Sequence, residues 1–121
     1  HTAWAREQVG SGPLLAPEHK VVLEADPDRA RAIGPSSVAP YLKLVNYASN
    51  LRRIGFTDAD LAGGGSDRLV DELALHGDAE AIGRGVTAHL DAGADHVCVQ
   101  VLGDDPMAGY RALAEALSLG S

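Results

Sequence analysis

The chain has 121 residues, 45% of them hydrophobic and 4% aromatic, which allows one domain at most with a small aliphatic core. Its formal net charge of −7 repels nucleic-acid backbones and anionic lipids, which excludes both as binding partners. No apolar run approaches the ~20 residues that cross a bilayer, and a single cysteine forms no internal disulfide framework, so we expect a cytoplasmic protein.

The first part of the chain predicts a helix, a buried strand and a second helix. Residues 2–9 have a helical pattern that ends at the breaker sequence GSGP, residues 10–13. The short apolar run His19–Glu24 contains β-branched residues and predicts a buried strand. Asp26 predicts the N-cap of the next helix, because Pro27 suits the first helical position.

A longer helical stretch is expected next, in several pieces. The Gly-Pro pair at 34–35 is expected to interrupt the second helix, with a restart at the serine pair 36–37, because proline clashes in a helix interior. Residues 46–54 place apolar side chains at i, i+4 and i+7, which predicts another helix. Thr57 and Asp60 predict a capping box for a short helical turn.

The last part predicts two helices, a strand and a final helix. Ser66 is expected to cap a helix that ends near Gly77, and Asp78 to cap a helix that ends at Gly93. The run His96–Leu102 is rich in valine and predicts the clearest strand of the chain. The loop sequence GDDP that follows this strand is expected to cap the final helix.

Strands that alternate with helices indicate an α/β fold with a parallel sheet. Only two strands are predicted, and two parallel strands neither close a barrel nor form a stable open sheet. The chain also begins with His1 rather than Met, inside a segment of helical pattern. We therefore expect this sequence to be one piece of a longer protein.

Four segments of the chain carry a family resemblance: PLLAPEHKVVLEADPDRAR (13–31), YLKLVNYASNLRRIGF (41–56), GDAEAI (77–82) and LDAGADHVCVQVL (90–102). Together they resemble the luciferase-like monooxygenase family, in particular its coenzyme F-420-dependent oxidoreductases. The resemblance covers nearly the whole chain, and the segment 41–56 is more specific than the common AGAD motif. It implies that residues 1–121 are the C-terminal part of one (β/α)8 TIM-barrel domain: strand seven, a helical insertion, strand eight and a final helix.

The resemblance implies a parent oxidoreductase that transfers a hydride between a flavin-type cofactor and a small organic substrate. Coenzyme F-420, a deazaflavin, is the expected cofactor, and FMN is the alternative. A complete barrel needs ~250 residues, so the catalytic residues are expected upstream and this chain alone is expected to be inactive. Family enzymes are often dimers, which makes a homodimer an expectation here. The alternative is a truncated, non-catalytic helical protein that binds a partner through exposed strand edges.

Four candidate site residues lie at near-helical spacing in the insertion, which in the family borders the substrate and cofactor cleft. They are Asn46, Tyr47, Asn50 and Arg53. The amides and the phenol would hydrogen-bond a substrate, and the guanidinium would hold an anionic group. The alternative interpretation is a solvated helix with the tyrosine packed inward, which is usual for polar residues on a surface helix.

Two more candidates lie at strand ends. Glu24 ends the first strand and Gln100 lies near the end of the second, and barrel enzymes bind substrate at the carboxyl ends of their strands. The alternative for both is a polar side chain that faces a helix layer. The glycines at 63–65 and Ser66 precede a helix whose start suits a phosphate, but such a polar glycine stretch is more often a flexible loop.

The histidines and the cysteine predict neither a metal site nor a nucleophile. His19 and His96 begin the two strands, at the end of a barrel that serves stability rather than catalysis. His76 and His89 are expected on helices with no Asp or Cys at ligand spacing, so no metal is expected. Cys98 lies in mid-strand and is expected to be a small buried hydrophobe.

Overall fold

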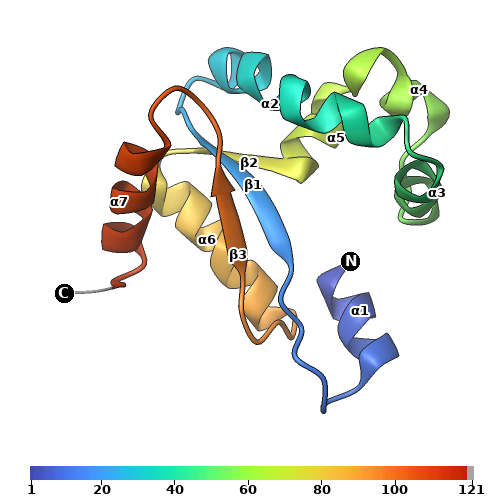
Figure 1. Cartoon of the computed structure of the whole chain (residues 1–121), viewed down its shortest axis with the longest axis horizontal. Coiled ribbons are helices and arrows are strands. Elements are labelled where there is room, and N and C mark those ends of the chain that lie inside the picture. Colours follow the sequence, from blue (N-terminus) through green and yellow to red (C-terminus); the bar gives the residue numbers. More distant parts are fainter. Residues whose placement is uncertain (120–121) are drawn as a thin grey trace.

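The computed structural model describes residues 1–119, in which helices surround a small sheet (Figure 1). In chain order the elements are α1 (Thr2–Val9), β1 (Glu18–Leu23), α2 (Pro27–Leu42), α3 (Val45–Arg53), α4 (Asp58–Leu61), the 3-10 turn η1 (Ala62–Gly64), α5 (Asp67–Leu73), β2 (Ala74–Gly77), α6 (Ala79–Asp91), β3 (Cys98–Val101) and α7 (Pro106–Ala116). The predicted α/β class is confirmed.

The strands form one parallel sheet in the order β2-β1-β3. Val21 at the centre of β1 lies beside Leu75 of β2 on one side and beside Val101 of β3 on the other. The prediction that segments 19–24 and 96–102 are parallel neighbours is therefore confirmed, although the observed strands are shorter or shifted at their ends.

The strand β2 corrects a prediction. The helix that follows Ser66 ends at Leu73 rather than near Gly77, and Ala74 adopts the extended φ of −134° and ψ of 102°. The four residues of β2 then pair with an edge of β1 that is distant in sequence. This pairing outweighs the local helical pattern, so His76 lies on a strand and not on a helix.

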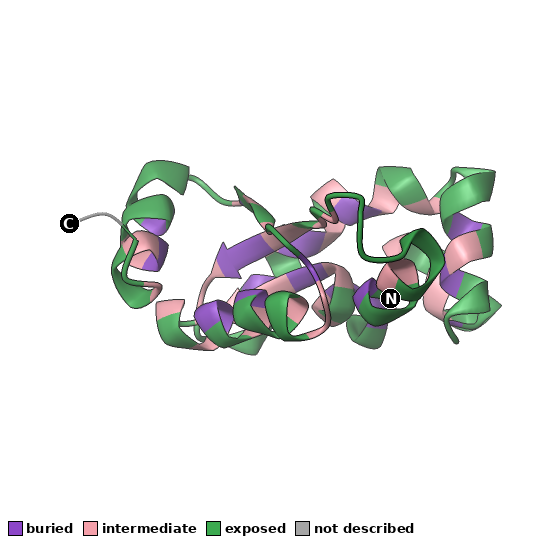
Figure 2. Cartoon of the chain, turned by 90° about the horizontal axis from the view of Figure 1, so that it is seen from below, coloured by how far each residue is buried: buried purple, intermediate pink, exposed green. Residues whose placement is uncertain are grey.

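Helices α6 and α7 cover one face of the sheet, and α2 lies over the other face with α5 packed against it. Successive side chains of a strand point to opposite faces, so Val21 and Val101 face α6 and α7. There they pack against Ile82, Val86 and Leu113 in the main core. Figure 2 shows this buried layer between the strands and the helices.

Helix α2 runs without interruption across Gly34 and Pro35, so the predicted break and restart are wrong. Gly34 is buried against α5, where an added Cβ would lie 2.9 Å from Val70 Cγ1. The Ser36 hydroxyl donates a hydrogen bond of 3.0 Å to the Ile33 carbonyl in the turn that contains the proline. Close packing of α2 on α5 therefore outweighs the local cost of proline in a helix.

Five N-caps have a side-chain hydrogen bond, four at the predicted residues and one within the predicted capping loop 103–106. Each side chain accepts a hydrogen bond from a backbone N–H of the first helical turn. They are Asp26, Thr57, Ser66, Asp78 and Asp105. The predicted helix 46–54 is present as α3, shifted by one residue. These features were predictable because a cap depends only on residues close in sequence.

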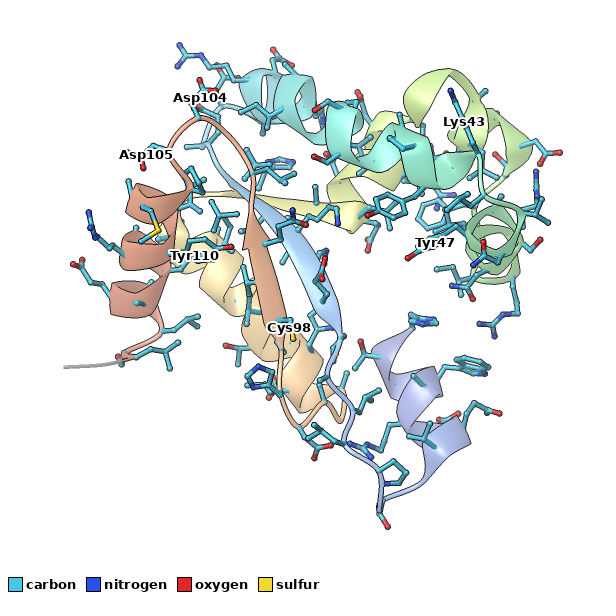
Figure 3. All side chains as sticks on the ribbon, viewed as in Figure 1. Lys43, Tyr47, Cys98, Asp104, Asp105 and Tyr110 are labelled. Carbon is cyan, nitrogen blue, oxygen red and sulfur yellow. The ribbon has the colours of Figure 1, made fainter. Side chains whose placement is uncertain are left out.

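The face of β1 and β3 that points away from α6 and α7 is partly open. It carries Glu18 and Lys20 on β1, in register with Cys98 and Gln100 on β3. Cys98 is exposed, so the expectation of a buried cysteine is wrong (Figure 3). The helix-covered side of β3 belongs to Val99 and Val101, and α2 covers the opposite face at β2 and β1.

Candidate functional site

The carboxyl ends of β1 and β3 open onto a crevice of about 330 Å³. Its lining residues are Val22, Leu23, Glu24, Ile33, Val101, Leu102, Gly103, Asp104, Asp105, Ala108 and Gly109. β1 is the central strand of the sheet. The next strand in the chain, β2, pairs with one edge of β1, and the last strand, β3, pairs with the other edge, so the order of strands reverses beside β1. Open parallel sheets bind ligands at such a switch point, and barrels bind them at the same ends of their strands.

Two glycines and a cap shape the β3 side of this crevice. Gly103 turns the chain out of β3 with a φ of 113°, a conformation that favours glycine. Asp105 then caps α7, and its carboxylate accepts a hydrogen bond of 3.1 Å from Ala108 N. Gly109 lets α7 approach β3, because a Cβ at this position would lie 2.6 Å from Val101 Cγ1.

A second hollow of about 340 Å³ continues the crevice toward α2. The two share Ile33, Leu102, Gly103 and Asp104, and the second hollow adds Ser36 and Ser37, of which Ser36 donates its hydroxyl to the Ile33 carbonyl. The continuous space therefore has apolar walls with hydroxyl and carboxylate groups at its rim. Such groups bind a small polar molecule by hydrogen bonds at its hydroxyl or amino groups.

The charge at the crevice is negative. Glu24, Asp104 and Asp105 line it. The Arg29 guanidinium lies 3.9 Å from the Glu24 carboxylate and 3.7 Å from the carboxylate of Asp26. Arg29 is 75% exposed, so solvent screens both pairs. Because the Asp105 carboxylate already engages the first turn of α7, the crevice has acceptors for a ligand but offers little to an anion.

Of the two candidates predicted at strand ends, only Glu24 lies in the crevice. Its Oε1 accepts a hydrogen bond of 3.2 Å from Asp26 N, which orients the carboxylate at the end of β1. Gln100 is exposed on the open face beside Lys20, one residue before the end of β3. The alternation of β3 explains this position, since Val101 and not Gln100 points toward α7.

The four candidates of the insertion lie on α3, which the structure places away from the crevice. Tyr47 and the loop residues Asp104 and Asp105 lie at opposite ends of the molecule in Figure 3. Arg53 donates to Asn50 Oδ1 at 2.6 Å, and its guanidinium lies 3.8 Å above the Trp4 ring. Asn46 is exposed. In this structure the α3 side chains therefore contact one another and α1, which agrees with the surface-helix interpretation.

Tyr47 is only partly packed and lines a separate hollow of about 320 Å³. Its ring centroid lies 5.1 Å from that of Tyr41, and Lys20 Nζ lies 5.1 Å from the Tyr41 centroid. Lys20 also pairs with Glu18 at 3.3 Å. Both tyrosines are more than a third exposed, so the inward packing that the alternative interpretation gave Tyr47 is incomplete.

A chain of hydrogen bonds joins two histidines at the opposite, amino-terminal ends of the strands. His19 Nε2 lies 2.8 Å from the Glu72 carbonyl, His19 Nδ1 lies 2.8 Å from His89 Nε2, and His89 Nδ1 lies 2.8 Å from Thr2 Oγ1. Burial lowers the pKa of both imidazoles. Their neutral forms satisfy every contact, because Thr2 donates to His89, His89 donates to His19, and His19 donates to the carbonyl.

Three carboxylates have lowered pKa values, and each of them forms an ion pair with an arginine. The guanidinium of Arg68 lowers the pKa of Asp60, and that of Arg31 lowers the pKa of Asp71. A backbone N–H from Leu15 lowers the pKa of Asp95, with Arg6 also in contact. None of these groups lines the crevice, so they serve the fold.

Sequence reasoning missed Asp104, Ser36, Ser37 and Gly109 as crevice residues. The signal for Asp104 was present, since the sequence GDDP directly follows the strongest strand and strand ends carry ligand sites. The serines had no such signal, because their position depends on α2 crossing the end of β1. Across residues 1–119, His, Cys, Asp and Glu form no group of three that would hold a metal ion. The helices of that range include none with the length and apolar character to span a membrane.

Comparison of the chain with protein-family models, curated proteins and solved structures found no match.

Proposed function

We propose that this chain is the C-terminal part of a luciferase-like, F-420-dependent oxidoreductase, with FMN as the alternative cofactor. One observation carries the proposal: β1 and β3 are adjacent parallel strands whose carboxyl ends, with Glu24 and the loop 103–105, open onto one crevice. In this proposal β1 and β3 are strands seven and eight of a (β/α)8 barrel, and the crevice is one wall of the substrate site in a cytoplasmic enzyme.

The two faces of the β1–β3 pair support the barrel. Parallel strands are normally covered on both faces, yet here α6 and α7 cover one face and the other is partly open. The open face carries Glu18, Lys20, Cys98 and Gln100. In a barrel this face would point inward, toward the other strands. The edge of β1 that β2 uses would then belong to strand six. Barrel closure therefore requires β2 to leave that edge, and it requires α2 to leave the inward face, which it covers at β1 and β2.

The residues of the crevice do not fit the anionic side chain of F-420 or the phosphate of FMN. Glu24 and Asp104 would repel it, and Asp105 competes for the donors at the start of α7. The proposed task of this chain is therefore to bind and orient the substrate. Its apolar wall excludes water, and the Glu24 carboxylate accepts a hydrogen bond from a substrate hydroxyl or amino group.

We predict that the 121-residue chain alone binds neither F-420 nor FMN, because a ligand site typically buries ~70–90% of its ligand and two strand ends supply a single wall. Titration of each cofactor with the chain, read by quenching of cofactor fluorescence, measures this. Saturable one-to-one binding at micromolar concentration would show that the cofactor site is local to this segment.

The family assignment is tested on the open reading frame that contains this sequence. The expected product carries six further strand–helix units, and its intact mass and absorbance spectrum reveal a bound deazaflavin or flavin. Glu24→Gln in that protein should raise KM for the substrate and leave the cofactor absorbance unchanged. A product without those units, or one that binds neither cofactor, would refute the proposal.

The second candidate function is a non-catalytic binding or assembly module. The observation that favours it is the outer edge of β3, which within residues 1–119 pairs with no other strand. An open reading frame without further strand–helix units would support this candidate and would contradict the barrel proposal.

A further inference from the structure

The crevice at the carboxyl ends of β1 and β3 has an acidic group on each of these strands. Glu24 follows β1 and Asp104 follows β3. Each comes three residues after a member of the register pair Val21 and Val101, so the two lie at the same level. Because neighbouring strands lie about 4.8 Å apart, these positions are close enough to contact one small ligand. Figure 3 shows Asp104 on the turn between β3 and α7.

The two carboxylates have few partners within the chain. Glu24 accepts a hydrogen bond of 3.2 Å from Asp26 N, and the exposed Arg29 guanidinium near it is shared with Asp26. Among residues 1–119 no side chain forms an ion pair with Asp104. The crevice lining in that range includes no lysine, arginine or histidine. Both carboxylates therefore keep charge and lone pairs for a ligand.

The walls between these carboxylates are apolar. Val22 and Leu102 line the crevice from the strands, and Ala108 lines it from the first turn of α7. Apolar walls exclude water from one side of a bound charge, so its contacts are screened less than on an open surface. An apolar group that covers the walls also removes their surface from water. The crevice therefore favours a molecule that combines an apolar body with a positive charge.

We propose that the substrate of this crevice is an organic cation, with an ammonium group between the Glu24 and Asp104 carboxylates and an apolar body against the walls. An ammonium group donates up to three hydrogen bonds, and the two carboxylates accept them. The net charge of −7 attracts such a molecule and repels an anion. The inference rests on the proposed role of the crevice as a substrate site, and it uses β1, β3 and α7, which the barrel retains.

Matched probes test this inference on the 121-residue chain. Cyclohexylammonium carries the charge and the apolar body, cyclohexanol lacks the charge, cyclohexanecarboxylate reverses it, and methylammonium lacks the body. Two-dimensional amide NMR spectra give the position and the dissociation constant of each probe. Cyclohexylammonium should shift the Leu102 and Ala108 amides at millimolar concentration and bind about tenfold more tightly than cyclohexanol or methylammonium. Cyclohexanecarboxylate should leave these amides unchanged.

Removal of one charge at a time tests the two carboxylates. Glu24→Gln and Asp104→Asn preserve the side-chain shapes, and each should weaken cyclohexylammonium binding about fivefold to tenfold without changing that of cyclohexanol. Glu7→Gln, at an exposed position on α1, is the matched control for net charge. It should change the dissociation constant less than about twofold, because salt screens a remote charge. If a variant loses its circular dichroism signal, the probe series on wild type still decides.

Three results would overturn the inference. They are cyclohexylammonium that does not bind in the crevice, cyclohexanol or cyclohexanecarboxylate that binds there as tightly, and an effect of Glu7→Gln as large as that of Asp104→Asn. The family assignment fails separately. An open reading frame without further strand–helix units would refute that assignment and leave the probe preference intact. A parent protein with a bound deazaflavin would keep the assignment even when the probes refute the organic cation.

Discussion

Two regions of this molecule are held together in different ways. In the first region, which contains β1, α6, β3 and α7, the strands β1 and β3 pair although they are distant in sequence. The main apolar core lies between these strands and the two helices. The segment α2–α5 has a smaller core, and ion pairs link its helices, such as Arg31 with Asp71 at 2.7 Å and Arg68 with Asp60 at 2.8 Å. The first region therefore depends on a long-range strand pairing and the main core, and the second depends on ion pairs between its helices and a smaller core.

The largest effects should come from emptying one core at a time. Ile82→Ala in the main core and Leu69→Ala in the smaller core should each lower the free energy of unfolding by about 2–5 kcal/mol, because both side chains are buried and leave cavities. Ile82→Ala should quicken hydrogen exchange throughout the protein. Leu69→Ala should quicken it in α3–α5 more than in β3.

Exchange measured residue by residue distinguishes these outcomes. Equal protection loss in β3 and α5 after Leu69→Ala would show that the two regions unfold as one unit, and the comparison between them would then fail.

A smaller effect is expected from adding one methyl group at a close helix contact in each region. Gly109→Ala places a Cβ 2.6 Å from Val101 Cγ1, and Gly34→Ala places one 2.9 Å from Val70 Cγ1. Both should cost about 1–3 kcal/mol by overpacking. Gly12→Ala is the control, since no atom lies within 4 Å of its Cβ. Urea unfolding measures all three, and a neutral Gly109→Ala would show that α7 shifts freely over β3.

The sequence predicted what depends on near neighbours and failed where distant segments decide. The caps at Asp78 and Asp105 follow from side chains and N–H groups three residues apart. The strand β2 was missed because its extended backbone exists only through pairing with β1. The burial of Cys98 was misjudged because coverage of a strand face depends on helices placed elsewhere in the chain.

The candidate site divides in the same way. Glu24 was predictable, since a carboxylate that ends a buried parallel strand must lie at the carboxyl edge of the sheet. The family resemblance predicted that Tyr47 and Arg53 line the same site as Glu24. In the structure Tyr47 contacts Tyr41, and Arg53 contacts Trp4. Nothing in the local sequence fixes that α3 packs beside α2 rather than at the carboxyl ends of the strands.

The smallest expected effect concerns pH, at the hydrogen-bond chain that joins the two regions and α1. Burial lowers the pKa of His19 and His89 below the ordinary value of 6.5. Lys20 opposes the charged form of His19, and the carbonyl and carboxylate of Glu72 favour it. Because the unfolded chain binds protons more readily at these groups, stability is constant above the ordinary pKa and falls as pH drops below it.

Replacement of either imidazole should flatten this dependence. His89→Gln and His19→Gln should lose less stability than wild type between pH 7.5 and 5.5, at the cost of lower stability at pH 7.5, because an amide does not reproduce every contact to Thr2 and Glu72. His96→Gln, at an exposed position, should keep the wild-type slope. Urea unfolding at several pH values gives these slopes. The carboxylates of Asp60, Asp71 and Asp95 have lowered pKa values. Their contribution to stability is complete above about pH 4 and is lost only as pH falls below that value, so it is constant in this window. Identical slopes for wild type and the His89 and His19 variants would show that the two imidazoles do not control stability in this range.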